Sequence, residues 1–414
     1  MRSNFTRAAP GRVLSAAVAG LVGAGLVLVN PPRAAAASSA SAFNDPLSGV
    51  RTEQTVIRDQ VVDLIRRADA GSTIRLSMYQ LWSATVARAL TAAHDDPLRA
   101  INVQVVLDDV SASSPVADGT YDTLKASLGT DTSRSSFVTL CPASRSCLGD
   151  PARGNSVSHN KYVLFSSAGG GSLRNVVVQT SSNLTPSSYD KYWNSSTTVT
   201  GNSTLYNAYV AYFQKLKAKN YSTWKYSSTS AGAQKAYFFP RAGTTNSSDT
   251  VVGILNNVDC SWSDSTGTHR TGIRLAMFTL TRQGVADKLA GLRRAGCYVD
   301  IVYTNMDAGT WRALHFSGGP RVRCYDYDDD GDSTTERMVM HSKYLLIDGW
   351  YYGRRDKVLW TGSANYSTPG LRSNDEALLK VNDDATAAAY RSNFDAVSGA
   401  AVPGAADNVT ECKS

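Results

Sequence analysis

The stretch His159–Ser167 reads HNKYVLFSS, and the stretch His341–Gly349 reads HSKYLLIDG. The two stretches lie 182 residues apart, and the same offset relates Asn183 to Asn365, with no gap across 25 residues. In each copy an apolar, β-rich run is followed by a turn-forming stretch and by a second apolar run that ends in Ser-x-Asn. We therefore expect each copy to form a hairpin whose first strand carries the His and the Lys.

A second repeat precedes each hairpin. The sequence STIRLSMYQLWSATVARALTAA, followed by INVQVVLDD, resembles GIRLAMFTLTRQGVADKLAGLRRAGCYVDIVYTN. Each copy has the pattern of a short strand, an amphipathic helix at 84–93 or 284–295, and a second strand. Two such βαβ-like units predict an α/β protein made of two pseudo-symmetric halves, 44–234 and 235–398, packed face to face. We expect residues 399–414 to form a loose tail.

Polar side chains of the same kinds recur in both hairpins. Side chains two apart on a strand share a face, so the His and the Lys of each copy project together. The Asn that ends the neighbouring strand can reach the same pocket, and two halves stacked face to face then surround one cavity with hydrogen-bond donors. Such a cavity suits phosphate, which carries oxygens on several sides. The expected site residues are His159, Lys161, Asn183, His341, Lys343 and Asn365.

These motifs resemble the signature of the phospholipase D superfamily, which is His-x-Lys-x4-Asp in each half, followed by Gly/Ser-x-Asn. The second copy is complete, with Asp348 and with Gly362 before Ser363. The first copy has Ser166 where the signature has Asp, and Thr180 in place of the Gly. The resemblance covers nearly the whole chain after the N-terminal segment. It implies two phospholipase D-like halves with the active site at their interface, and a supporting role for the Asp of the signature.

The resemblance also implies the chemistry. One His attacks phosphorus to give a phosphohistidine, and the other protonates the leaving alcohol and then activates water or an acceptor alcohol. No metal and no cofactor are expected. In this family the carboxylate after one motif tends to reach the His of the other half, so we expect Glu376 to orient His159, the nucleophile. The equivalent residue of the first half, Asn194 without a gap or Ser196 with one, is neutral and is expected to face His341, the acid.

The N-terminal segment 1–37 has the order of a secretory signal, with arginines first, then an apolar run, then small residues that offer Ala-x-Ala cleavage. We expect a secreted, soluble protein, with a retained membrane anchor as the alternative. Six cysteines in an exported chain favour disulfides, and Cys141 with Cys147 is the expected local pair. The other pairings, including that of Cys412, are left open.

The composition narrows the possible classes of substrate but does not identify one. With 42% hydrophobic residues among 414, the chain is neither disordered nor fibrous. Without the N-terminal segment, 38 basic residues face 35 acidic ones, which supplies little of the basic track that nucleic acids need. We favour a monomeric phospholipase D-type hydrolase that contacts a membrane surface transiently and also transfers phosphatidyl groups. A metal-independent nuclease, a catalytically weakened binding protein and an enzyme for soluble glycerophosphodiesters are the alternatives.

Five aromatic residues were considered for the membrane contact, at the rim of the expected site: Trp82, Trp193, Trp350, Tyr351 and Tyr352. For the first two, a place in the core is an equal alternative.

One further stretch, DYDDDGDSTTER from Asp326, resembles an EF-hand loop. Its twelfth residue is Arg337, where such a loop needs a carboxylate. We therefore favour a solvated acidic turn, with calcium binding as the alternative.

Overall fold

The computed structural model describes residues 37–328, 331–332 and 335–403. The predicted signal segment, apart from residue 37, and Cys412 lie outside the described residues. Within the described residues, no helix is long and apolar enough to cross a membrane.

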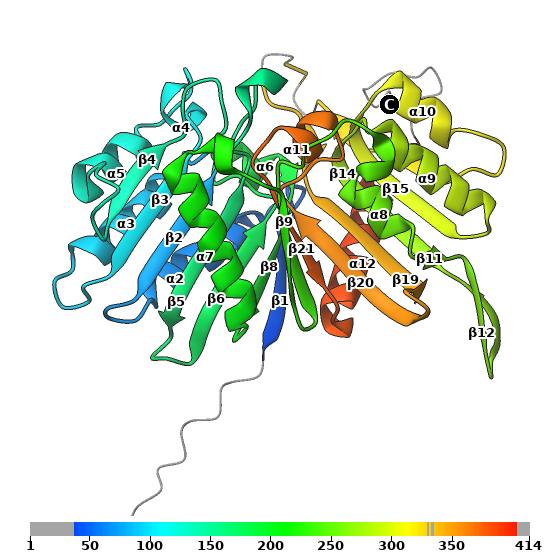
Figure 1. The fold of residues 1–414 in the computed structure, drawn as a ribbon, viewed down its shortest axis with the longest axis horizontal. Helices are drawn as coiled ribbons and strands as arrows, with labels where there is room; N and C mark the ends of the chain where they lie inside the picture. The colour runs from blue at the N-terminus through cyan, green and yellow to red at the C-terminus, as the bar shows by residue number, and fades with distance from the viewer. Residues whose placement is uncertain (1–36, 329–330, 333–334, 404–414) are drawn as a thin grey trace, which may run out of the picture. The chain divides into compact units, whose positions relative to one another are not determined.

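The first sheet has seven strands in the order β1-β8-β6-β5-β2-β3-β4 (Figure 1). Its inner strands β5 and β6 carry consecutive apolar residues that are buried on both faces, so they read as nearly continuous apolar runs. The strands are β1 (Ser38–Phe43), β2 (Thr73–Met78), β3 (Asn102–Leu107), β4 (Phe137–Leu140), β5 (Lys161–Ala168), β6 (Leu173–Thr180) and β8 (Ser195–Thr200).

The second sheet runs β22-β16-β15-β14-β19-β20-β21-β10-β9, and β11 (Val258–Asp259) pairs with β19 outside this path. Its strands are β9 (Ser227–Ala231), β10 (Gln234–Phe238), β14 (Gly272–Leu280), β15 (Tyr298–Met306), β16 (Arg321–Cys324), β19 (Lys343–Tyr351), β20 (Arg354–Gly362), β21 (Ala377–Val381) and β22 (Val402–Pro403). The segment β21-β20-β19-β14-β15-β16 repeats the order β8-β6-β5-β2-β3-β4 of the first sheet. The predicted α/β fold with two pseudo-symmetric halves is therefore confirmed.

Helices cover both faces of each sheet. In the first half α2 (Val56–Arg66), α3 (Ala84–Asp95) and α5 (Thr120–Leu128) share one core with β2 and β3, while α7 (Ser203–Ala218) packs on the other face. In the second half α8 (Thr250–Leu255) and α9 (Gln283–Arg294) lie on one face and α12 (Asp384–Ala400) on the other. The predicted helices 84–93 and 284–295 correspond to α3 and α9. Side-chain hydroxyl capping by Ser83 starts α3, and its apolar residues at helical spacing are buried.

The remaining elements are short. They are α1 (Arg51–Gln54), α4 (Val110–Ser113), α6 (Pro186–Asp190), α10 (Ala308–Leu314), α11 (Thr368–Arg372), β7 (Tyr192–Trp193), β12 (Ser261–Asp264), β13 (Gly267–Arg270), β17 (Asp326–Tyr327) and β18 (Met338–Met340), with single 3-10 turns at Pro151–Arg153, Tyr221–Thr223 and Asn246–Ser248.

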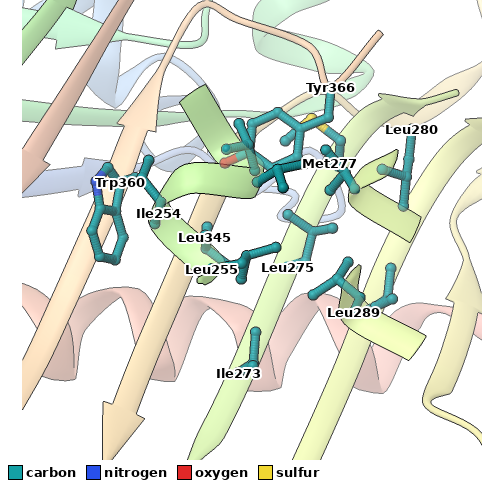
Figure 2. Packing of buried hydrophobic residues seen from close by; sticks show 14 of the residues in the cluster. Ile254, Leu255, Ile273, Leu275, Met277, Leu280, Leu289, Leu345, Trp360 and Tyr366 are labelled. Atoms are coloured by element: carbon teal, nitrogen blue, oxygen red, sulfur yellow. The ribbon is translucent and has the colours of Figure 1, made fainter. Parts of the chain in front are cut away.

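The core of the second half lies between its sheet and α8 and α9. Figure 2 shows Leu275 and Met277 of β14 pointing toward Leu255 of α8 and Leu289 of α9, and all four are fully buried. Burial of such side chains contributes about 1.5–3 kcal/mol each. This packing holds β14 against β19 and so fixes the strand that carries Lys343.

The limits of the halves differ in detail from those expected. β1 starts six residues before residue 44 and completes the first sheet by pairing with β8. Residues 399–403 are not loose, because Gly399 and Ala400 end α12 and β22 pairs with β16. Residues 404–414 lie outside the described residues. The boundary near Gln234 stays a prediction; that residue begins β10 of the second sheet, and β9 belongs to the same sheet.

Two disulfides join described cysteines. Cys141 is bonded to Cys147, as predicted, and Cys260 is bonded to Cys297. Among the described cysteines none carries a free thiol. Each half therefore contains one of these two covalent links.

Asp326 and Arg337, two described residues of the acidic stretch, pair with each other. Asp326 is buried, and its carboxylate accepts a hydrogen bond from Arg337 Nε at 2.8 Å. The Arg that stands at the closing position therefore pairs with the residue that would be the first calcium ligand.

Candidate active site

The two His-Lys pairs lie at the starts of equivalent strands. Lys161 is the first residue of β5 and Lys343 the first of β19, and a His lies two residues before each. Both Lys side chains are fully buried, whereas His159 is 9% and His341 5% exposed. Each lysine ammonium donates a hydrogen bond to the carbonyl of the His in its own pair.

Backbone pairing brings each His against the other half. Ser158, before the first His, forms a parallel bridge with Asp375, and Met340, before the second, pairs in parallel with Trp193. Residues 158 and 340, like 193 and 375, are related by the same offset of 182 as the motifs. The site is therefore built twice from one pattern, with each half supplying the strand that flanks the other's His.

Each His consequently meets a side chain from the opposite half. Nδ1 of His159 lies 2.9 Å and 3.0 Å from the two carboxylate oxygens of Glu376. Nδ1 of His341 lies 2.9 Å from Oδ1 of Asn194. These are the two contacts across the halves that the sequence predicts. Asn194 has the position that the ungapped repeat gives it. The two histidines therefore differ in the charge of their partners, one a carboxylate and the other a neutral amide.

The hydrogen-bond network fixes which nitrogen of His341 carries a proton. The amide nitrogen of Asn194 donates to the Ser188 carbonyl at 3.0 Å, so Oδ1 is the atom that faces the ring. Oδ1 can only accept, hence Nδ1 of His341 must donate. A carboxylate fixes Nδ1 of His159 as a donor in the same way. In both neutral rings Nε2 therefore keeps its lone pair.

The two Asn side chains lie differently. The backbone N–H of Thr279 donates a hydrogen bond to Oδ1 of Asn365 at 3.3 Å. The side-chain amide nitrogen of Asn365 has no hydrogen-bond partner in the described part of the chain, so it is available as a donor. Asn183 donates instead to the side-chain oxygen of Gln80 at 2.9 Å. Its own Oδ1 is buried with no partner among the described residues. The sequence did not single out Gln80.

Burial and neighbouring positive charges lower the pKa values of the histidines and lysines of the site. Burial lowers the pKa of His159 to about 4, with Lys161 adding to the shift and Glu376 opposing it. Burial also lowers the pKa of Lys161 to about 7. The pKa values of His341 and Lys343 lie well below their ordinary values, first through burial and then through the charge of the neighbouring lysines. Four basic groups thus share a buried site in which an added anion relieves their repulsion.

Three aromatic rings flank the histidines and were missed from the sequence. The Tyr79 ring centre lies 5.0 Å from that of His159, and the Phe278 and Tyr192 ring centres lie 4.9 Å and 5.2 Å from that of His341. Lys161 and Lys343 point their ammonium groups at the faces of Tyr79 and Phe278, at 5.1 Å and 5.0 Å. The second repeat, which precedes each hairpin, aligns Tyr79 with Phe278, and this was the signal available for these two rings.

Asp108 is a further acidic group beside the site. Its carboxylate accepts from the backbone N–H of Ser158 at 2.6 Å and of Val110 at 3.1 Å. Burial raises the pKa of Asp108 to about 6, although these hydrogen bonds and Lys161 oppose the shift. The residue follows β3 directly and positions the backbone next to His159.

The structure does not bring Asp348 to this cluster. Asp348 lies five residues along β19 from Lys343, and its carboxylate pairs with Arg355. At the equivalent place Ser166 accepts a hydrogen bond from Thr73 N at 2.9 Å. The acidic residue of the signature is therefore remote from the histidines in this chain, and its replacement in the first half leaves the cluster unchanged.

The aromatic residues expected at the rim lie elsewhere. Trp82 and Trp193 are buried, which agrees with the core alternative. Tyr351 is buried against Trp360, and Trp350 and Tyr352 lie at the β19–β20 turn, the end of β19 opposite Lys343. The placement of these three residues at the rim was wrong, because a nine-residue strand carries them about 25 Å from its start.

Within the described residues, the one cluster with the proximity of metal ligands is Cys141, Cys147 and Asp375, and its two sulfurs are joined in a disulfide.

Comparison with known proteins identifies the fold. Residues 268–398 match the family model described as "Cardiolipin synthase, PLD-like domain". Phosphatidylserine synthase of Haemophilus influenzae Rd KW20 is similar in structure, with a TM-score of 0.55 at 13% identity over 86% of this chain and 85% of that one. Polyphosphate kinase of Porphyromonas gingivalis has a TM-score of 0.55 at 14% identity over 86% of this chain, which spans 50% of the kinase. No curated protein sequence matches. Residues 268–398 therefore match a phospholipase D-like domain, and the fold of the chain is similar to that of the phosphatidylserine synthase.

Proposed function

We propose that this protein is a secreted phosphodiesterase of the phospholipase D type, which hydrolyses phospholipids through a phosphohistidine on His159. The observation that carries the proposal is the crossed pairing of the site. Glu376 meets Nδ1 of His159 while the neutral Asn194 meets Nδ1 of His341. Two histidines with free Nε2 atoms and different partners suit two different roles.

In the first step Nε2 of His159 attacks phosphorus, and the bond from phosphorus to the leaving oxygen breaks. The leaving oxygen takes a proton from Nε2 of His341, which enters the step as imidazolium. The ring of His159 becomes positively charged on attack, and Glu376 stabilises that charge. The Lys and Asn side chains hold the non-bridging oxygens, where negative charge increases.

In the second step Nε2 of His341, now neutral, takes a proton from water or from an acceptor alcohol. The resulting oxygen nucleophile bonds to phosphorus while the bond from phosphorus to Nε2 of His159 breaks, and its electron pair returns to the ring. Water gives hydrolysis and an alcohol gives phosphatidyl transfer. No metal ion and no cofactor take part in the proposed reaction.

The lowered pKa values of the two histidines fit this order of events. Without substrate, His341 is held neutral by burial and by Lys343. A phosphodiester anion between the lysines reverses the sign of the nearby charge, so its binding favours the imidazolium that the first step needs. Substrate binding and activation of the acid are thereby coupled.

The proposal of a lipid substrate and the proposal of secretion rest on separate observations. The matching family model and the phosphatidylserine synthase carry lipid chemistry in their descriptions. The near balance of charge after the N-terminal segment argues against nucleic acid. The signal-like N-terminal segment and the two disulfides support secretion. We propose a monomer that meets lipid at a membrane surface.

The test is a product assay with purified protein lacking residues 1–37, incubated with phospholipid vesicles or with plasmid DNA, with EDTA present throughout. We expect release of the head group from phospholipid and intact DNA. His159→Asn and His341→Asn serve as matched inactive controls. Cleavage of DNA alone would assign a nuclease instead, and activity that calcium or zinc alone restores would exclude the metal-free reaction.

A further inference from the structure

A polar cavity lies at the far end of the second sheet from the histidines. It has a volume of about 320 Å³. It lies where β14 begins, next to the β12–β13 hairpin, and β12 is labelled at the right of Figure 1. Its lining residues are Trp262, His269, Arg270, Gly272, Arg274, Tyr298, Asp348, Arg355 and Arg391.

The strand register separates this cavity from the active site. Gly272 pairs with Asp348, and Met277 pairs with Lys343, so the two places are five residues apart along β14. At about 3.3 Å per residue this is roughly 16 Å. A ligand in the cavity is therefore a second ligand and not an extension of a phosphate held by the histidines.

Arg274 is the central feature of the cavity. It is 8% exposed. No hydrogen-bond acceptor contacts its guanidinium within the described parts of the chain, and its closest partner is the Tyr298 ring, with 5.4 Å from guanidinium carbon to ring centre. Burial, followed by the charge of Arg391, lowers the pKa of Arg274, and the carboxylates of Asp395 and Asp300 oppose this shift. A buried guanidinium with unused donors is costly and is normally paired.

The equivalent arginine of the first half has hydrogen-bond partners within the protein. Arg75 stands at the equivalent place in the repeat, and its guanidinium donates to Gln104 at 3.0 Å and to the Tyr206 hydroxyl at 3.2 Å. In the strand register Arg75 faces Gln104, just as Arg274 faces Asp300. The carboxylate of Asp300, however, accepts from the Tyr298 hydroxyl at 2.9 Å and pairs with Arg321 at 3.4 Å. Arg274 is left without the partners that its counterpart has.

The other charged groups leave the cavity positive. Arg355 pairs with Asp348, and Arg391 with Asp395, which lies outside the lining. Arg270 donates to the carbonyls of Gly296 and Cys297, which carry no net charge. His269 pairs with Asp264. The lining itself therefore has four guanidinium groups and one carboxylate.

We propose that this cavity is a binding site for a phosphate group, either inorganic phosphate or a phosphate monoester, held by Arg274 with Arg270 and Arg391. Guanidinium groups match the oxygens of phosphate in pairs of hydrogen bonds. The volume leaves room for a small group esterified to the phosphate beside Trp262. The proposal does not rest on the proposed activity, since none of these residues takes part in it.

Calorimetric titration of the whole protein with inorganic phosphate tests the proposal. Arg274→Met is expected to weaken phosphate binding at this site by about tenfold to a hundredfold, the usual effect of removing a charged hydrogen bond. Arg391→Gln, at a half-exposed position, is expected to weaken it in the same direction and guards against misfolding of the first variant. Arg75→Met is the matched control and should leave binding unchanged, with thermal unfolding reporting the folded state of each variant.

Phosphate also suits the active site, so Lys343→Met separates the two. Binding that persists in Lys343→Met and weakens in Arg274→Met supports the proposal. Binding lost in Lys343→Met but unchanged in Arg274→Met and Arg391→Gln would overturn it. A parallel arm with phosphatidic acid vesicles identifies the source of the phosphate: sedimentation with vesicles that depends on Arg274 assigns a lipid monoester, and its absence together with Arg274-dependent phosphate binding assigns a soluble one.

Discussion

The two halves of this protein repeat one chain path but differ at matched positions. His159 meets a carboxylate where His341 meets an amide. Arg75 donates hydrogen bonds to two side chains of its own half, whereas Arg274 faces a cavity. Because strand order and register are the same, these differences come from single side chains and not from the backbone. A duplicated fold therefore lets each half be the control for the other.

The largest effect is expected from removal of the nucleophile. His159→Ala should lower phosphodiester hydrolysis by roughly 10⁴-fold or more and should form no phosphoryl adduct. His341→Ala should accumulate an adduct on His159 when the leaving group of the substrate needs no proton. Mass spectrometry of peptides from the quenched reaction locates the acid-labile phosphohistidine. An adduct on His341 in place of His159 would reverse the two roles.

The crossed partners of the histidines give the next effect. Glu376→Gln should lower kcat by about 10³-fold, because the positive charge formed on His159 loses its counter-charge. Glu376 raises the pKa of His159 against burial, so its removal lowers that pKa. Activity requires neutral His159, so the acidic limb of the pH profile of kcat/KM should move to lower pH. Asn194→Asp is the matched change in the other half, and an equal shift of that limb in both variants would contradict the assignment.

The two disulfides differ in the length of chain that they close. Cys141 and Cys147 are six residues apart, and Cys260 and Cys297 are 37 apart. Loss of the longer link is expected to cost about 4 kcal/mol of unfolding free energy, and loss of the shorter one about 2 kcal/mol. Urea unfolding of Cys→Ser double variants measures both. A larger loss for the short loop would show that its contacts with the carboxylate of Asp375 matter more than loop length.

The last prediction concerns the pH dependence that Asp108 gives to stability. Its folded-state pKa of about 6 lies above the ordinary value of 3.8. The folded state therefore binds the carboxyl proton of Asp108 more tightly than the unfolded state does. This protonation stabilises the fold by at most about 3 kcal/mol below pH 4, and the stabilisation is lost as pH rises through 6. Asp108→Asn should remove this part of the pH dependence of the unfolding free energy. Asp307→Asn is the matched control, because Asp307 is exposed and caps α10; the same slope in wild type and Asp108→Asn would disprove the assignment.

Most of the fold was predictable because it follows from local patterns of apolar and polar residues. Alternation of apolar residues and the offset of 182 gave two hairpins and two βαβ units at their correct places. The resemblance to the phospholipase D signature predicted Glu376 as the partner of His159. The ungapped repeat pointed to Asn194 as the residue facing His341, with Ser196 as the gapped alternative. Edge strands such as β1 were not predictable, since a run of Ser and Ala becomes a strand only where β8 offers a free edge.

The sequence by itself determined which residues could do phosphate chemistry and that they occur in pairs. Only the tertiary structure decided which of them meet. Asp348 belongs to the same motif as Lys343, yet the extended strand between them carries it to a different cavity. Tyr79, Gln80 and Asp108 carry no motif and still lie at the site. The physical reason is that a strand separates neighbours in sequence by about 3.3 Å per residue, while pairing across the halves brings residues over 200 positions apart within hydrogen-bonding distance.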